Sequence, residues 1–328
     1  MSNKTMLGPS QARLPISLVA RDLEEVERIY QKTLDPFRAK FGPVIQHLDN
    51  YRGKRLRPML VLLAGHAAGG VTRNHHVLGA VVEMIHTATL VHDDVLDAAA
   101  TRRHGSTVNA AWGNHASILL GDMLFSAAFC LCATVDAAAC EIIGETTNRV
   151  CAGELQQVTT AGRLDLTEAD YFDIIEGKTG VLTECATRLG ARYAGASVAA
   201  ERHMADYGRH LGMAFQVADD VLDLRGDETT AGKTLGTDLA QRKMTLPLIR
   251  YLNSLSEADD RRVKGRLATH DHDAEILDAV IASGAVESAQ LQAEAMIDEA
   301  HKALGHLPAS PYRTALEHVA RWAVRRTA

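Results

Sequence analysis

The chain has 328 residues, of which 46% are hydrophobic and 23% are charged, and its formal net charge is −6. This balance is typical of a globular protein. It excludes a disordered acidic tail and disfavours a nucleic-acid partner, which would require a basic surface. Aromatic residues make up only 5% of the chain and prolines number only 8, so helices are favoured over strands.

The sequence carries no pattern for export or membrane insertion, and we expect a cytoplasmic protein. The five cysteines are odd in number and lack a Cys-x-x-Cys spacing, which argues against a disulfide framework and a structural zinc site. The apolar stretch at 14–20 is too short for a secretory signal. The most apolar window, 116–135, carries Asp122 near its middle, so it predicts a buried helix and no transmembrane segment.

Apolar residues recur every three to four positions from 18 to 48, which predicts a helix with one buried face. After a basic turn, Pro58 suits the first turn of a second helix ending near Ala68. Further helices are predicted, in chain order, over residues 75–99, 116–139, 141–161, 168–193, 201–223, 246–255, 257–270 and 273–283, with two more toward the C-terminus. No alternating strand pattern or linker stands out, so we predict an all-α protein with residues 1–328 in a single domain.

The most informative feature is the pentapeptide Asp-Asp-Val-Leu-Asp, which occurs at 93–97 and again at 219–223. On a helix, residues four apart share a face, so the first and last aspartates of each copy form a carboxylate pair. Such pairs repel unless a cation joins them, and their hard oxygen ligands suit Mg²⁺, which commonly binds substrate phosphates as well. One acidic cluster is usually solvated surface, but two matching copies favour a metal site. The predicted metal-binding residues are Asp93, Asp94, Asp97, Asp219, Asp220 and Asp223.

Basic residues at glycine-associated turns accompany both acidic segments. They are Lys54, Arg55, Arg57, Arg102, Arg103, Lys178, Lys233 and Lys243. Arginine binds phosphate through its bidentate fork and lysine as a point charge, although most such residues in any protein are scattered surface charge. Because several lie near the acidic pairs in sequence, the combination indicates a diphosphate bridged by Mg²⁺.

Two further patterns resemble known binding motifs only weakly. Residues 226–234 come near a phosphate-binding P-loop, but the glycines are one residue too far apart and the segment follows a helix rather than a strand. The His-Asp-His-Asp cluster at 270–273 lies away from every other motif and is interpreted as a loop beside a helix.

The chain resembles the trans-type (head-to-tail) polyprenyl diphosphate synthase family, in particular its long-chain, octaprenyl-like members. The segments that carry the resemblance are Gly53-Lys-Arg-Leu-Arg-Pro58, Glu83-Met-Ile-His-Thr-Ala-Thr-Leu-Val-His-Asp-Asp94, Arg102-Arg103, Gly121-Asp122, Gly153-Glu154-Leu155-Gln156, Lys178-Thr179, Phe215-Gln216 and Lys243-x-Thr-Leu-Pro247. One departure is His104, where many relatives have glycine, so that Gly105 is displaced by one position. The resemblance implies a helical bundle of the isoprenoid synthase type around a central cavity, and a Mg²⁺-dependent prenyltransferase.

The resemblance also implies that the site is divided between two diphosphate substrates. Asp93, Asp97 and Asp219 would ligate Mg²⁺, with Asp94, Asp220 and Asp223 in support. Those metals would hold the diphosphate of an allylic substrate together with Arg102, Lys178, Lys233 and Lys243, and Thr179 would help to stabilise the allylic cation. Isopentenyl diphosphate would be held by Lys54, Arg57, His86 and Arg103, with Phe215 and Gln216 close by.

Product length depends on the floor of an apolar tunnel beneath the metal site. Thr89 lies one helical turn before Asp93, with Ala88 beside it. Both are small where short-chain relatives commonly carry bulky aromatics, so we expect a long-chain all-trans product grown from farnesyl or geranylgeranyl diphosphate. The resemblance further implies a homodimer, centred on the helix at 116–135, and it allows loose membrane association for product release.

Three alternative functions differ from a long-chain synthase in what they require of the sequence. In a geranylgeranyl diphosphate synthase, a side chain from another helix would close the tunnel. A non-catalytic synthase subunit, or a prenyl-lipid-binding protein, would be expected to lose one acidic cluster, and this chain has both. A terpene cyclase needs no basic pocket for a second diphosphate and usually lacks an Asp-rich second metal site.

Overall fold

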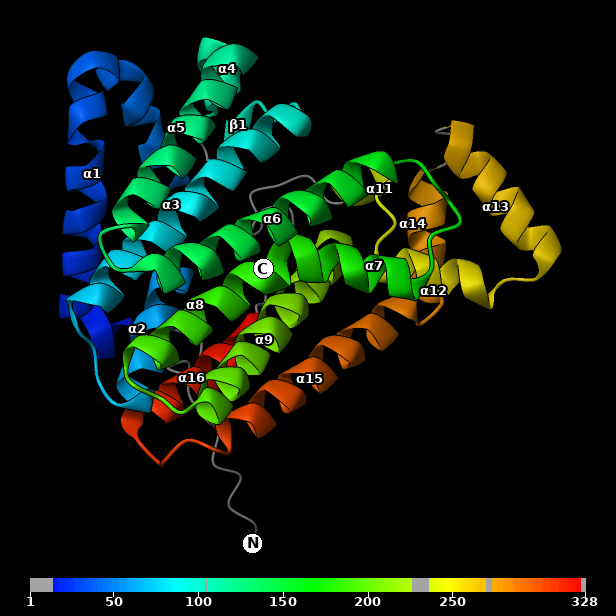
Figure 1. Cartoon of the computed structure of the whole chain (residues 1–328). Coiled ribbons are helices and arrows are strands. Elements are labelled where there is room, and N and C mark those ends of the chain that lie inside the picture. Colours follow the sequence, from blue (N-terminus) through cyan, green and yellow to red (C-terminus); the bar gives the residue numbers. More distant parts are fainter. Residues whose placement is uncertain (1–13, 104, 226–235, 270–272, 326–328) are drawn as a thin grey trace, which may run out of the picture.

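The computed structural model describes residues 14–103, 105–225, 236–269 and 273–325, which form a bundle of helices (Figure 1). The first half of the chain contains α1 Ala20–Gln46, α2 Leu56–Ala68, α3 Arg73–Leu96, α4 Val108–Trp112, α5 Asn114–Cys132 and α6 Ala137–Thr159. The second half contains α7 Glu168–Ile175, α8 Val181–Tyr193, α9 Val198–Arg225, α11 Thr237–Ala240, α12 Leu246–Ser254, α13 Glu257–Thr269, α14 Asp273–Ala282, α15 Ala285–Leu304 and α16 Pro311–Val324. The predicted all-α class is confirmed.

The centre of the bundle is α2, which contacts α1, α3, α8 and α16. Its residues 58–65 are all buried, as expected for a helix that is apolar on every side. Helix α8 contacts both α3 and α9, so the two helices that carry the aspartate-rich segments lie against the same neighbour. Helices α12, α13 and α14 lie at the periphery of the bundle (Figure 1).

Two predicted helices are interrupted. The helix predicted over 116–139 ends at Cys132, and α6 begins anew where the Asp136 carboxylate accepts a 2.8 Å hydrogen bond from the Ala139 N–H. This aspartate N-cap overrides the continuing apolar pattern. The helix predicted over 168–193 contains a π-helical turn, Glu176–Gly180, between α7 and α8. Such turns inside helices occur frequently at functional sites.

The segment after α3 forms a short antiparallel hairpin, where the sequence predicts a loop. Its strands are β1 Thr101–Arg102 and β2 Gly105–Ser106. The Thr107 hydroxyl then caps α4 by accepting a hydrogen bond from the Ala110 N–H. The hairpin directs Arg102 back toward the end of α3, where the first aspartate-rich segment lies.

Among the described residues, α5 is the one helix that is long and apolar enough to cross a membrane by length and composition. It packs against α3, α4 and α6, and core helices of globular bundles commonly pass the same test. Only 39% of its most apolar stretch is buried, and Ile118 and Leu119 remain exposed. An exposed apolar patch of this kind marks a surface that contacts something else.

Asp22 joins three helices, because its carboxylate accepts hydrogen bonds from His66 Nε2 of α2 at 2.9 Å and from His76 Nε2 of α3 at 2.8 Å. Burial raises the pKa of Asp22, but these two hydrogen bonds outweigh it and leave the pKa below its usual value. We expect Asp22→Asn to lower the free energy of unfolding by about 1 kcal/mol at pH 7. Since a lowered pKa reflects stabilisation of the ionised form, the difference should shrink as the pH falls below about 4.

Urea unfolding at several pH values would measure this difference. Asp35→Asn removes an exposed ion pair with Arg38 and serves as the control, with no measurable change expected. A loss in Asp22→Asn that persists in acid would show that the ionised carboxylate is not its source.

Candidate active site

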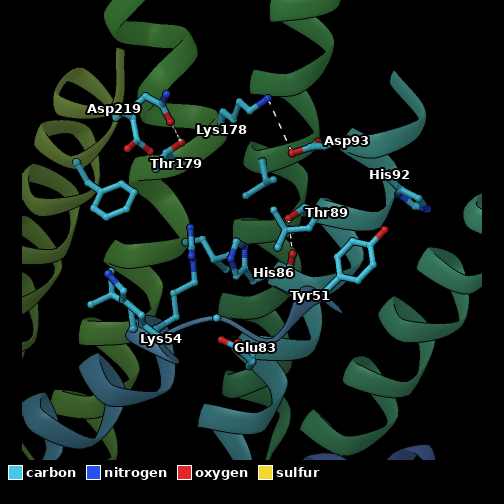
Figure 2. A pocket seen from close by; sticks show the side chains of 18 of the residues that line it. Tyr51, Lys54, Glu83, His86, Thr89, His92, Asp93, Lys178, Thr179 and Asp219 are labelled. Carbon is cyan, nitrogen blue, oxygen red and sulfur yellow. Dashed lines mark hydrogen bonds and ion pairs between the residues drawn. The ribbon is translucent and has the colours of Figure 1, made fainter. Parts of the chain in front are cut away.

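Two adjoining cavities lie inside the bundle. The central cavity, of about 620 Å³, is lined by the turn at 51–57, α3, α6, the π-helical turn, α9 and α16. The second cavity, of about 460 Å³, is lined by the end of α3, α6, α7, α9 and residues 238–245. Leu96, Glu154, Lys178 and Gln216 line both. Figure 2 shows Asp93 and Asp219 on the two sides of Lys178, and we call this part of the central cavity the acidic end. Lys54 and His86 lie toward the opposite end, which we call the basic end.

The first aspartate-rich segment distributes its three carboxylates over different surroundings. Asp93 lines the central cavity and Asp97 lines the second. Asp94 is fully buried and accepts hydrogen bonds from Arg102, at 2.9 and 2.7 Å, and from the Tyr51 hydroxyl at 2.5 Å. Neither Asp94 nor Arg102 lines the central or the second cavity, and the pair instead anchors the β1–β2 hairpin.

The second aspartate-rich segment is divided in the same way. Asp219 lines the central cavity and Asp220 lines the second. The Asp223 carboxylate accepts hydrogen bonds from the Thr237 hydroxyl at 2.7 Å and the Asp238 N–H at 3.1 Å. Asp223 thus holds the first turn of α11 and lies in the lining of neither cavity.

Lysines accompany the carboxylates at the acidic end. Lys178 Nζ lies 2.8 Å from Glu154 Oε2 and 4.0 Å from Asp93 Oδ2. Burial raises the pKa of Asp93 to about 6, an effect that Lys178 opposes and that Glu154 reinforces. In the second cavity, Lys243 Nζ lies 3.6 Å from Asp97 Oδ1. These carboxylates still outnumber the two ammonium groups, so the acidic end would attract a further cation.

A chain of hydrogen bonds fixes Thr179 in the π-helical turn. Its hydroxyl donates to Gln216 Oε1 at 3.0 Å, and Gln216 Nε2 donates to Asp220 Oδ1 at 2.9 Å. The Tyr171 hydroxyl donates to the other Asp220 oxygen at 2.6 Å. Burial and the nearby Asp238 carboxylate raise the pKa of Asp220 to about 8. Asp220 therefore acts on the central cavity through Gln216 and Thr179.

The basic end of the central cavity is lined by Lys54, Arg57, His86 and Arg103. Burial lowers the pKa of Arg57 to about 10, and its Nε has no hydrogen-bond partner in the described part of the chain. Burial, with Arg57 and Arg103 nearby, lowers the pKa of His86 well below its usual value, so His86 is neutral near pH 7. A buried guanidinium nitrogen with no partner, among further cations, fits an anion with several oxygens, such as a diphosphate.

Arg55 belongs to the same turn but its guanidinium is committed elsewhere. Its backbone has a φ of +52°, in the left-handed region that non-glycine residues rarely adopt. The guanidinium lies 2.6 Å from Glu83 Oε1 and 2.8 Å from Glu27 Oε2. These two ion pairs hold the turn in its unusual conformation, so Arg55 lines the cavity with its charge already paired, whereas Lys54 and Arg57 line it without a carboxylate ion pair in the described part of the chain.

Of the two predicted chain-length residues, the structure brings one into the central cavity. Thr89 lines it, as do Val150 and Cys151 of α6. Ala88 is fully buried and lies outside the lining. Phe215, Gln216 and Lys243 lie where the sequence places them, in the cavity linings. Lys233 and residues 270–272 lie outside the described residues.

The carboxylates at the acidic end can contribute to a metal site but cannot enclose a metal. Among the described residues, no three acidic, histidine or cysteine side chains are grouped so that they could hold an ion on their own. Asp93 and Asp219 present oxygen ligands from two helices to one cavity. This donor set fits Mg²⁺, which commonly takes one or two carboxylates and completes its shell with water and phosphate oxygens.

Comparison with known proteins identifies the family. A family model described as polyprenyl synthetase matches residues 39–283. The chain belongs to the polyprenyl synthetase family. This polyprenyl synthetase is 38% identical over 313 residues to the octaprenyl diphosphate synthase of Escherichia coli (strain K12), covering 94% of this chain and 97% of that one.

Solved structures agree with this assignment. A decaprenyl diphosphate synthase from Rhodobacter capsulatus gives a TM-score of 0.89 at 36% identity, with 95% of this polyprenyl synthetase and 98% of that chain covered. A polyprenyl synthase from Caulobacter crescentus CB15, complexed with calcium and isoprenyl diphosphate, gives 0.88 at 37% identity, with 95% and 97% covered. The predicted family, the isoprenoid synthase type of fold and the prenyltransferase class are confirmed.

Several residues of this polyprenyl synthetase site were not assigned a role from the sequence. Glu83 and Glu154 stand in the motifs that carry the resemblance, yet a lone carboxylate gives no sign of the cation it will pair with. Asp238 lies five residues before Lys243 but outside the motif segments, Trp322 lies far from every motif, and both enter the cavity linings through tertiary packing. No spacing in the sequence could have revealed these two.

Proposed function

We propose that this polyprenyl synthetase condenses isopentenyl diphosphate with an allylic prenyl diphosphate, either farnesyl or geranylgeranyl diphosphate, and extends it to a long-chain all-trans polyprenyl diphosphate. The observation that carries the proposal is the separation of charge along the central cavity. Asp93 and Asp219 line one end, and Lys54, Arg57 and Arg103 line the other. Such a cavity suits two diphosphates, one bound through a metal ion and one bound directly by cations.

The acidic end suits the allylic substrate. Mg²⁺ held by Asp93, Asp97 and Asp219 would offset the negative charge that builds on the diphosphate as the carbon–oxygen bond breaks. Lys178 and Lys243 lie beside the same carboxylates and would add direct ammonium contacts to the departing diphosphate. Both lysines are thus placed to hold the allylic diphosphate while its carbon chain becomes a cation.

The allylic cation and the second substrate would meet between the two ends. Thr179 donates its hydroxyl proton to Gln216, so its oxygen lone pairs are left to stabilise a nearby cation. Isopentenyl diphosphate at the basic end would direct its double bond at that cation, and the released pyrophosphate would take up the proton that is lost. The neutral His86 lines the same end and can donate a hydrogen bond to the diphosphate. No side chain need act as a strong base.

The small side chain of Thr89 supports a long product, as do the names of the octaprenyl and decaprenyl relatives. We expect Thr89→Phe to shorten the product toward geranylgeranyl diphosphate, because an aromatic ring at this position would fill the part of the cavity beneath Asp93. Reverse-phase sizing of radiolabelled products would measure the change. Thr269→Phe, on the peripheral helix α13, is the matched control and should leave the product unchanged. Products of unchanged length from the Thr89→Phe enzyme would show that this position does not limit the length of the product chain.

We also propose that residues 1–328 act as a single synthase domain in a cytoplasmic homodimer. The exposed side chains of Ile118 and Leu119 on α5, with Leu155 and Val158 on α6, support an apolar contact between two subunits. Loose membrane association, for release of the apolar product, belongs to the same proposal.

The purified chain, supplied with Mg²⁺, labelled isopentenyl diphosphate and farnesyl diphosphate, tests the proposed function. We expect incorporation that EDTA abolishes and Mg²⁺ restores, with products longer than geranylgeranyl diphosphate. Products that stop at geranylgeranyl diphosphate would favour the short-chain alternative. If the chain alone incorporates no label, the proposed function fails in favour of a non-catalytic subunit.

A further inference from the structure

The last helix brings an aromatic side chain to the basic end of the central cavity. Trp322 of α16 lines this cavity together with Lys54 and Arg57. Lys54 Nζ lies 4.9 Å from the centre of the Trp322 ring. This distance is within the range of about 6 Å over which the face of an indole attracts an ammonium group. The C-terminal helix therefore contacts the basic turn at 51–57 through a cation–π interaction.

Lys54 shares with Arg57 and Arg103 of the basic end the lack of a carboxylate ion pair within the described residues, whereas several other cations near the cavities are paired with carboxylates. Lys178 pairs with Glu154, Lys243 with Asp97, Arg102 with Asp94, and Arg55 with Glu83. For Lys54 the described part of the chain offers no carboxylate in ion-pair range, and the Trp322 ring is its identified partner. A lysine side chain has a flexible four-carbon stem, so an unheld ammonium would occupy many positions. The ring restricts it without neutralising its charge.

The Trp322 ring itself packs near a second aromatic side chain that lines the same cavity. Phe215 of α9 lies with its ring centre 6.2 Å from that of Trp322, and the two planes are inclined by 36°. Phe215 directly precedes Gln216, the hydrogen-bond acceptor of Thr179. The aromatic pair thus connects the basic turn to the helix that carries Asp219, and it places the Lys54 ammonium relative to the acidic end.

We propose that Trp322 is a positioning residue for the second substrate: its ring holds the Lys54 ammonium where it meets the diphosphate of isopentenyl diphosphate. This inference rests on the proposed function. A carboxylate partner would compete with the substrate for the ammonium, whereas an aromatic face leaves the positive charge available to a phosphate. Trp322 is therefore expected to affect binding of isopentenyl diphosphate and not binding of the allylic substrate, which occupies the acidic end.

Kinetics of substituted enzymes test the proposal. We expect Trp322→Leu to raise the KM for isopentenyl diphosphate about tenfold, while kcat and the KM for the allylic substrate change less than twofold. Trp322→Phe keeps an aromatic face that attracts a cation less strongly than indole, so its KM should lie in between. Trp112→Leu, an exposed tryptophan of α4, is the control and should change neither constant. Equal increases in both KM values would show a merely structural role and overturn the proposal.

A double-mutant cycle decides whether Trp322 acts through Lys54. Lys54→Met alone should raise the KM for isopentenyl diphosphate, and adding Trp322→Leu should raise it no further. Independent, multiplicative effects of the two substitutions would contradict the proposal even if each single effect is as expected.

Tryptophan fluorescence can report binding of the diphosphate at the basic end without catalytic turnover. The chain has two tryptophans, so Trp112→Phe leaves Trp322 as the sole indole. Titration with isopentenyl diphosphate, or with inorganic diphosphate, should alter its emission, because the bound anion changes the charge 4.9 Å from the ring. Lys54→Met in this background should abolish the response. If the Trp322 emission does not change in an enzyme that still transfers isopentenyl units, this inference is wrong and the proposed function stands. If the wild-type chain transfers no isopentenyl units, the proposed function itself is wrong.

Discussion

Asp219→Asn is expected to reduce prenyl transfer about a thousandfold, as measured by incorporation of labelled isopentenyl diphosphate at saturating substrate and Mg²⁺. The amide keeps the shape of the side chain but removes the charge that Asp219 presents to the central cavity opposite Asp93. Loss of a metal-binding carboxylate removes several kcal/mol of stabilisation of the charge on the departing diphosphate. Calorimetric titration with inorganic diphosphate should accordingly lose much of its dependence on Mg²⁺.

The matched control is Asp223→Asn, one turn further along α9. In the repeated pentapeptide, Asp219 and Asp223 are equally plausible metal ligands, but in the structure their surroundings differ. Asp223 accepts hydrogen bonds from the Thr237 hydroxyl and the Asp238 N–H and lines neither cavity. We expect a loss in Asp223→Asn of about tenfold or less, arising from a loosened α11. Comparable losses in the two variants would show that Asp223 is also a metal ligand.

The difference between Asp219 and Asp223 shows what a sequence can predict about this site. The position of each aspartate-rich segment is predictable, because each lies at the end of a long helix whose apolar residues recur with a helical period. The direction of an individual carboxylate is not, because it depends on partners that are distant in sequence. Asp94 turns toward Tyr51 and Arg102 for this reason. The basic turn was predictable as a cluster of charge, whereas the pairing of Arg55 with Glu83 and Glu27 was not.

The interruptions of the predicted helices have a similar cause. Between 116 and 139 the sequence is mostly apolar, α5 ends at Cys132, and α6 begins where the Asp136 carboxylate caps its N-terminus. Between 168 and 193 nothing in the local sequence requires a π-helical turn. That turn depends on the approach of α6, whose Gly153 lies against Gly177. Local periodicity therefore predicts the bundle, and contacts between helices determine the details that place Lys178 and Thr179.

Gly153→Ala tests the contact between Gly153 of α6 and Gly177 of the π-helical turn, and we expect it to reduce kcat strongly. A Cβ at position 153 would lie 2.6 Å from the backbone nitrogen of Lys178 and 2.7 Å from the carbonyl carbon of Gly177. Backbone atoms cannot rotate away as a flexible side chain can, so the π-helical turn would have to move, and Lys178 and Thr179 would move with it. Misplacement of reacting groups by about 1 Å can cost about a hundredfold in rate. We expect kcat to fall by about that factor.

Gly144→Ala separates this effect from the general consequences of adding a methyl group to α6. The same helix carries Gly144, where an added Cβ meets nothing within 4 Å, so the substitution should leave kcat unchanged and raise the melting temperature slightly. Circular dichroism would establish that the Gly153→Ala protein keeps its helices. Full activity in a folded Gly153→Ala enzyme would mean that the turn tolerates displacement. Because Glu154 follows Gly153 directly and pairs with Lys178, one helix contact sets both partners of the ion pair beside Asp93.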